Sequence, residues 1–207
     1  MPLHAPLNPG SVVWSGENHG ILLKEDPEGP WSALMLFFRL HYSPEGGGTA
    51  LLLYEQPDVA ASLPEACNVM ISDNPGLARY LMNEFIGKLG NSPFAASPAF
   101  PAVQFLELTE SRNRGDAITD FTEIVKAPGV DVELVWQQLG TPTALELPKE
   151  LTGGKENDMY SLLIESRDPR ILVNGRTLRG KPVGRVQAGI ETTTAFLYFS
   201  ESWIRPA

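Results

Sequence analysis

Short apolar segments, separated by glycine- and proline-rich breaks, constrain the fold of this chain more than any other feature of its sequence. The 207 residues include 19 glycines and 18 prolines, whereas average shares are about 7% and 5%. Breaks such as Asp26-Pro27-Glu28-Gly29-Pro30 interrupt regular structure between the apolar segments. Many turns between short apolar segments are typical of β-structure, so we expect a protein rich in strands.

The most hydrophobic segment, Ala33–Tyr42, is predicted to be a strand because its side chains alternate between two faces. One face carries Leu34, Leu36, Phe38, Leu40 and Tyr42, and the other carries Met35, Phe37, Arg39 and His41. Both faces begin apolar, which predicts a central strand covered on each side, or a wall whose inner face lines something. The segment Thr49–Gln56 follows a flexible loop and is expected to pair with this strand as a hairpin.

One segment has helical periodicity instead. Asn74 can cap a helix, and Pro75 suits the first helical position, where a missing N–H costs nothing. The apolar side chains of one helical stripe are Leu77, Leu81 and Phe85. Gly90 is expected to end the helix in a left-handed conformation. The sequence therefore predicts one principal helix at about residues 75–89, whose apolar face closes over a sheet.

The second half of the chain is predicted to be a series of strands. These are Ala102–Thr109, Ala117–Lys126, Asp131–Gln138, Asp158–Arg167, Arg170–Val173, Arg176–Leu178 and Thr192–Ile204. Asn174-Gly175 is expected to form a two-residue hairpin turn, because both residues tolerate positive φ. Two polar segments, Ser15–Gly20 and Ser111–Asp116, are predicted to be turns. The first would join Ser11–Trp14 and Ile21–Lys24 as a hairpin.

Together these elements predict an α+β, mainly β fold: an antiparallel barrel or strongly curved sheet with one principal helix. Strand-like segments run through most of the chain without a long linker. We therefore expect an N-terminal arm over residues 1–10 and a single β-rich domain over residues 11–207. In the last strand, alternation places Phe196 and Tyr198 on one face and Leu197, Phe199 and Trp203 on the other.

The acidic composition limits the expected partners. The formal net charge is −9 and the isoelectric point is about 4.8, so nucleic acid is not an expected partner. The single cysteine, Cys67, cannot form an internal disulfide, and no cysteine cluster could hold zinc. The first residues lack the features of a signal peptide, and the apolar runs are too short to span a bilayer. We expect a cytoplasmic protein with no cofactor, no metal and no membrane partner.

The candidate ligand-binding residues lie on one face of the strand Ala33–Tyr42. They are Met35, Phe37, Arg39 and His41. An apolar floor with a cationic rim would suit a small apolar or anionic ligand. The alternative is that the strand leaves the core there and its polar end is solvated. The familiar catalytic and phosphate-binding motifs are absent, so no residue is assigned a catalytic role.

Two further polar patterns leave alternatives open. Glu17 and His19 could supply two metal ligands or an acid/base couple, but two ligands do not make a site. The neighbouring asparagine and glycines favour a plain turn instead. Polar residues also interrupt the later strands at Gln104, Glu107, Glu123, Glu133, Gln138 and Glu165. Most should face solvent, whereas a carboxylate that pointed inward could transfer protons through a raised pKa.

The hypothesis that these patterns favour is a small-molecule-binding, β-barrel-like module. One alternative is a small enzyme that uses the same cavity for acid/base chemistry, and another is a structural or assembly subunit. A lumen filled by phenylalanine and leucine would favour the assembly subunit, whereas an open lumen with a buried carboxylate or histidine would favour the enzyme. Exposed sheet edges also predict a homodimer, with the strand ending at Trp203-Ile204 as its contact.

Overall fold

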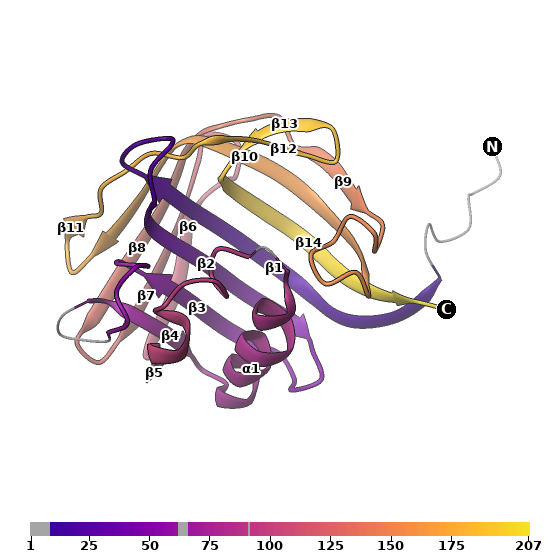
Figure 1. The fold of residues 1–207 in the computed structure, drawn as a ribbon, viewed down its shortest axis with the longest axis horizontal. Coiled ribbons are helices and arrows are strands. Elements are labelled where there is room, and N and C mark those ends of the chain that lie inside the picture. Colours follow the sequence, from indigo (N-terminus) through magenta and orange to yellow (C-terminus); the bar gives the residue numbers. More distant parts are fainter. Residues whose placement is uncertain (1–8, 62–65, 91) are drawn as a thin grey trace.

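A computed structural model describes the chain except for residues 1–8, 62–65 and 91. Its strands form a strongly curled sheet with a helical segment against one side (Figure 1). The strands are β1 (Gly10–Lys24), β2 (Trp31–Tyr42), β3 (Gly48–Tyr54), β4 (Asn68–Ser72), β5 (Gln104–Glu107), β6 (Glu110–Gly115), β7 (Asp120–Ala127), β8 (Val130–Leu139), β9 (Thr143–Leu147), β10 (Asp158–Val173), β11 (Arg176–Thr177), β12 (Gly184–Gln187), β13 (Ile190–Thr193) and β14 (Ala195–Pro206). The helical segments are α1 (Pro75–Tyr80), the π-helical turn η1 (Leu81–Phe85) and the 3-10 turns η2 (Ile86–Lys88) and η3 (Phe100–Ala102).

This is the predicted α+β, mainly β fold, realised as a curved sheet with one principal helical segment. Most of the predicted N-terminal arm lies outside the described residues, and Gly10 already belongs to β1. Among the described residues, every helix is too short or too polar to cross a membrane.

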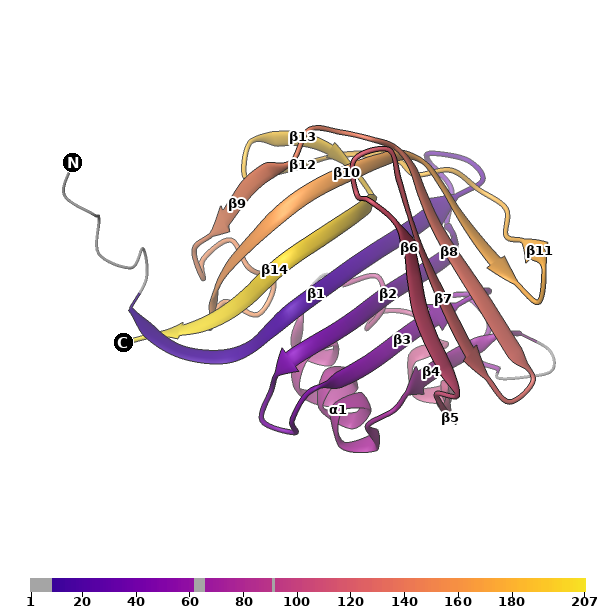
Figure 2. The same cartoon turned by 180° about the vertical axis from the view of Figure 1, so that it is seen from behind.

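Ten strands follow one another across the sheet in the order β5-β4-β3-β2-β1-β14-β10-β8-β7-β6. Strands β9 and β11 also pair with β10, and β12 and β13 form a separate hairpin. The β4–β5 pair is parallel, and the pairs along the rest of this order are antiparallel. Strands β1 and β14 lie side by side in the middle of the sheet (Figure 2).

The two end strands of this order, β5 and β6, are consecutive in the chain. Leu108 and Thr109 link them. The Leu108 N–H donates to the carbonyl of Ser72 at the end of β4 (3.0 Å), and the Thr109 N–H donates to the carbonyl of Lys126 in β7 (2.8 Å). The curl therefore brings the two ends of the sheet together at one point, as Figure 2 shows.

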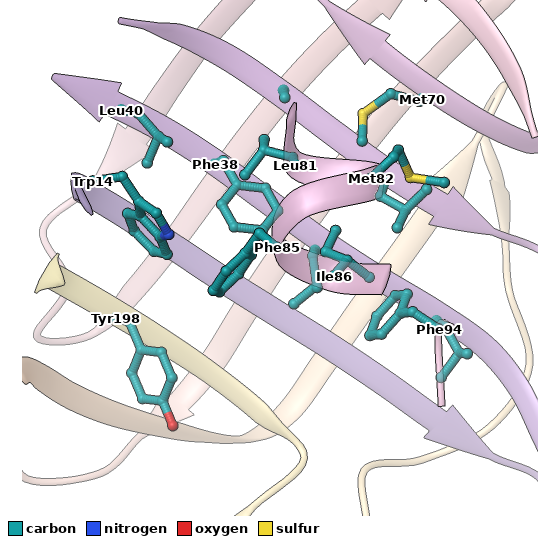
Figure 3. Packing of buried hydrophobic residues seen from close by; sticks show 14 of the residues in the cluster. Trp14, Phe38, Leu40, Met70, Leu81, Met82, Phe85, Ile86, Phe94 and Tyr198 are labelled. Atoms are coloured by element: carbon teal, nitrogen blue, oxygen red, sulfur yellow. The ribbon is translucent and has the colours of Figure 1, made fainter. Parts of the chain in front are cut away.

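The alternation predicted for β2 is confirmed, because the two faces of the strand contribute to two separate cores. Met35 and Phe37 join a core inside the curl, opposite residues of β7, β8 and β10; we call this side the lumen face. The side chains of β2 on the other face, the helix face, are Leu34, Leu36, Phe38 and Leu40. They pack with the helical segment, where Trp14 and Phe38 surround Phe85 (Figure 3).

The start of the helix is confirmed in detail. The Asn74 side chain accepts hydrogen bonds from the backbone N–H groups of Gly76 (3.0 Å) and Leu77 (3.1 Å). The helical segment ends at Lys88, but only its first part is α-helical. Gly90 does not supply the expected left-handed stop, because Leu89 already leaves the helix with extended backbone angles.

The predicted turn at Ser15–Gly20 is wrong, since β1 runs unbroken through it and pairs with β2 and β14 along this stretch. Its glycines serve close packing rather than a turn. A Cβ at Gly16 would lie 2.2 Å from the carbonyl oxygen of Arg39, and one at Gly20 would lie 2.3 Å from the ring of Phe196.

Other boundaries differ as well. The predicted turn Ser111–Asp116 is largely strand β6, and β10 joins two predicted strands into one. The predicted strand Thr192–Ile204 divides into β13 and β14. Strands β4, β9 and β12 were not predicted from the sequence. The β2–β3 hairpin and the Asn174-Gly175 turn, with φ of 49° and 76°, are confirmed.

The predicted face of Trp203 is wrong. Ser200 has a positive φ of 53°, and the pairing of β14 with β1 shifts register beside it, between Gly16 and Asn18. Such a bulge reverses the alternation that follows it. Trp203 therefore shares the helix-face core with Phe196 and Tyr198 rather than the lumen core.

Candidate functional site

The four predicted ligand-binding residues lie in different surroundings along β2. Met35 and Phe37 are fully buried in the lumen core. Arg39 is half-buried, and His41 is exposed near the end of the strand. The apolar part of this face is covered by side chains from the opposite wall of the curl. A role of these residues in ligand binding stays a prediction.

Arg39 joins two walls of the lumen through its guanidinium group. Nη1 lies 2.6 Å from Oε2 of Glu17, which is paired with Arg39 across β1 and β2. Nη2 lies 2.8 Å from Oε2 of Glu123, which comes from β7 on the opposite wall. The Glu123 side chain is fully buried, whereas about a quarter of the Arg39 side chain is exposed. Arg39 therefore connects a buried carboxylate with the surface.

Charge pairing offsets the cost of burial in this group. Burial by itself would raise the pKa of Glu17, but the neighbouring His19 and Arg39 outweigh it and lower that pKa. Burial would likewise lower the pKa of Arg39, but the carboxylates of Glu123 and Glu17 raise it. Arg39 is therefore firmly cationic, and Glu17 is an anion at neutral pH.

His19 lies beneath this group in an aromatic box. Its ring stacks on Phe37, with centroids 5.9 Å apart. Three further rings contact it edge-on, namely Phe121, Trp136 and Phe199. The His19 side chain is fully buried, and neither ring nitrogen has a hydrogen-bond partner among the described residues. Nε2 lies 3.7 Å from Oε2 of Glu17, which exceeds hydrogen-bonding distance.

A three-residue cluster follows from this arrangement. The ligand-type atoms of Glu17, His19 and Glu123 all lie within 4.8 Å of one another. Because the segment is a strand, Glu17 and His19 point to the same face two residues apart. The sequence offered the Glu-x-His pattern, but it could not supply the third residue, which is more than a hundred positions away in β7.

On the helix face, a cavity of about 260 Å³ opens between the sheet and the helical segment. Its wall is mainly apolar and includes Leu22, Leu36, Phe85, Leu147, Phe196 and Trp203. The volume lies just below the range of about 300–1,000 Å³ that is typical of pockets for drug-sized ligands. Two apolar residues at this cavity are largely exposed to solvent. Leu151 belongs to the wall and is 62% exposed, and Val186, between two wall residues of β12, is 71% exposed.

A buried carboxyl group belongs to the wall of this cavity. Glu201 is only 1% exposed, and its Oε1 accepts hydrogen bonds from Nε1 of Trp203 (2.5 Å) and Nδ2 of Asn18 (3.4 Å). Burial raises the pKa of Glu201 to about 8, although these two hydrogen bonds oppose the shift. At neutral pH the group is mainly the neutral acid, and the free Oε2 is the oxygen that can carry the proton.

A second polar group lines the same cavity from the β12–β13 hairpin and β14. The Arg185 guanidinium lies over the ring of Phe196, 4.6 Å from its centroid. Arg185 Nη2 donates to the Tyr198 hydroxyl (3.3 Å), which donates in turn to Oε1 of Gln187 (2.6 Å). Burial raises the pKa of Tyr198 to about 12, so the hydroxyl stays neutral.

A larger hollow of about 810 Å³ lies among the loops beside β11. It is open to solvent, and two of its charged residues, Glu55 and Arg176, form an ion pair with each other. The helix-face cavity differs because it contains polar atoms that are buried and have no hydrogen-bond partner in the part of the chain that the structure describes. Those atoms are Oε2 of Glu201, Oδ1 of Asn18 and Nε of Arg185.

Few features of the sequence indicated the helix-face cavity. Glu201 interrupts an apolar strand, which is a usable signal, but its face depends on the bulge at Ser200. Asn18 belonged to the segment predicted as a turn. Comparison of the chain with known protein families, curated proteins and solved structures finds no match.

Proposed function

We propose that this chain is a small-molecule-binding module and that its ligand occupies the helix-face cavity. The observation that carries the proposal is the pair Glu201 and Asn18, each with one oxygen that is buried in the wall of an apolar cavity and unpaired among the described residues. Buried polar atoms are nearly always hydrogen-bonded, because leaving one unpaired costs about 1–3 kcal/mol. A ligand head group that reached both atoms would remove this cost.

The chemistry of the pair selects the ligand class. Protonated Glu201 offers a donor at Oε2, and Asn18 offers an acceptor at Oδ1. A neutral group that carries an acceptor beside a donor, such as a primary amide, matches both. The apolar wall suits a short hydrocarbon body. We therefore propose a small, neutral, amphipathic ligand with an amide-like head.

Thermal melts with a chain-length series test this proposal. Primary amides from butanamide to octanamide should raise the melting temperature at pH 6.5, by more than carboxylates or amines of equal length. Glu201→Leu should lose the response; because it leaves the donors of Trp203 and Asn18 without their acceptor, circular dichroism must first show that it folds. Leu89→Trp, which fills the cavity, should lose it too. The matched control Glu146→Gln alters a carboxylate outside the wall and should keep it.

A response that survives Leu89→Trp would place the ligand elsewhere. No response to any amide would contradict the ligand class. The predicted site at Arg39 offers a comparison: anionic ligands whose effect disappears in Arg39→Gln would favour the lumen side instead.

Each alternative function retains one supporting observation. A carboxyl group with a pKa near neutral could act as a general acid, which favours a small enzyme; turnover of a bound amide that Glu201→Gln abolishes would support it. The filled lumen favours an assembly subunit.

As for location, a cytoplasmic protein is in keeping with the single, buried, unpaired Cys67.

A further inference from the structure

We propose that Glu17, His19 and Glu123 form a binding site for a divalent transition-metal ion, which exchanges with the guanidinium group of Arg39. This site is separate from the helix-face cavity and does not depend on the proposed ligand there. Its residues come from β1 and β7, and they meet on the lumen face above the aromatic box.

The first argument for a metal site is the set of donor groups. One imidazole and two carboxylates are ligands that zinc, manganese and iron accept, and three protein ligands leave positions free for water or substrate. The ligand-type atoms already lie within 4.8 Å of one another. Around Zn²⁺, bonds of about 2.0–2.1 Å place neighbouring ligand atoms about 3.3 Å apart. The ligand atoms that lie farthest apart would therefore have to close in by up to about 1.5 Å.

The second argument is that buried polar atoms of the cluster are unpaired within the described part of the chain. Both ring nitrogens of His19 and Oε1 of Glu123 are buried without a hydrogen-bond partner among the described residues. The four aromatic rings around His19 present only ring edges and faces to it. A partner for its ring nitrogens must therefore lie on the side of the two carboxylates. A cation between the carboxylates would give one ring nitrogen of His19 and Oε1 of Glu123 a partner.

The third argument is the balance of charge at the site. The two carboxylates hold two negative charges, and Arg39 compensates one of them. A divalent ion would compensate both. Arg39 also lines a hollow of about 370 Å³ together with Asp73 and Glu110, which gives the displaced guanidinium room beside two other carboxylates. The same exchange predicts that removal of the Arg39 charge strengthens metal binding.

The experiment removes the other histidines first. His41 is exposed and His4 lies outside the described residues, so the double variant His4→Ala/His41→Ala, without a histidine tag, leaves His19 as the sole imidazole. Titration calorimetry with Zn²⁺ should give one site per chain. Long-range ¹H–¹⁵N spectra of the imidazole should shift on Zn²⁺ addition, which a structural ion-pair network would not produce.

Three variants in this background decide the proposal. Glu17→Gln should weaken Zn²⁺ binding by about tenfold or more, the scale of losing a partner of a metal site. Arg39→Gln should strengthen it by on the order of tenfold, because a positive charge beside the ion is removed. Glu133→Gln removes a carboxylate that pairs with Arg114 and does not belong to the cluster, so it should change nothing.

Absence of Zn²⁺ binding in the sole-histidine protein, or an unshifted His19 imidazole, would overturn the proposal. Binding that Glu17→Gln leaves unchanged would do the same. If Arg39→Gln fails to fold, as circular dichroism would reveal, the Glu17→Gln titration and the imidazole spectra still decide the outcome.

Discussion

The side chain of Glu123 is fully buried. Among the described residues, its carboxylate accepts its hydrogen bond from Arg39. Replacing Arg39 by alanine would leave this carboxylate buried without its counter-charge. We expect the free energy of unfolding to fall by about 3 kcal/mol, the scale measured when one partner of a buried ion pair is removed. Urea unfolding at neutral pH measures this loss.

A second substitution checks the cause. Adding Glu123→Gln to Arg39→Ala removes the uncompensated charge, so the double variant should regain most of the lost stability. If Arg39→Ala alone changes stability by less than about 0.5 kcal/mol, the pair behaves as solvated side chains and the interpretation is wrong.

Glu201 makes stability depend on pH in the opposite sense to most carboxylates. Its pKa is about 8 in the folded protein but close to 4.5 in the unfolded chain, so the folded state binds more protons between these values. Its contribution to stability is complete below pH 4.5 and is lost as the pH rises towards 8. We expect wild type to lose up to about 1.4 kcal/mol per pH unit over this window, relative to Glu201→Gln.

Denaturant unfolding of both proteins between pH 5 and 9 gives this difference directly. The two stability curves should separate as the pH rises and run parallel above about pH 8. Curves that stay parallel throughout would mean that Glu201 titrates near its ordinary value.

At the residue scale, the sequence predicted positions better than partners. The pattern of β2 placed Met35, Phe37 and Arg39 on one face correctly, because alternation depends only on the strand itself. The partners of Arg39 come from a neighbouring strand and from β7 across the lumen. Such pairings depend on the curl of the sheet, which no local pattern encodes.

At the level of single elements, β1 was the hardest to predict. Its middle is polar, with Glu17, Asn18 and His19 between two glycines, and such a composition is typical of turns. The segment is a strand because β2 and β14 satisfy its backbone groups on both sides. Its polar side chains contribute to both proposed sites, so the prediction failed where polar side chains replace the usual apolar alternation.

The helix was predictable because its signals are local. Asn74 caps two N–H groups, and its Nδ2 also donates to the carbonyls of Glu45 (2.9 Å) and Gly47 (3.1 Å) in the β2–β3 loop. We expect Asn74→Ala to lower the free energy of unfolding by about 1–2 kcal/mol, the upper part of the range for a lost cap.

Asn74→Asp separates the two roles of this side chain. Aspartate keeps the cap acceptor but cannot donate to the loop, so its loss of stability should lie between wild type and Asn74→Ala in chemical denaturation. An alanine variant as stable as wild type would show that the cap contributes nothing here.

For the whole molecule, composition and periodicity predicted the fold class, but not how the sheet closes. Closure depends on Leu108 and Thr109, which belong to an otherwise ordinary stretch of sequence. The order of strands is equally non-local, since β1 pairs with β14 and β10 pairs with β8.

Self-association stays a prediction, but the structure moves its expected contact. Strand β14 cannot offer an edge, because β1 and β10 flank it. Among the described residues, β5 and β6 are the ends of the sheet order, and Phe105 on β5 is 49% exposed. We expect a dimer in sedimentation velocity that Phe105→Glu shifts towards monomer. A wild-type monomer at high concentration would contradict this.

The central pairing of β1 with β14 affects when the sheet can fold during synthesis on the ribosome. Strand β1 is synthesised before its neighbour β14, which follows almost two hundred residues later in the chain. Until then, β1 exposes one unpaired edge and the apolar side chains of both cores. The middle of the sheet can therefore form only after synthesis of β14, so we expect it to form late in folding rather than by stepwise assembly during translation.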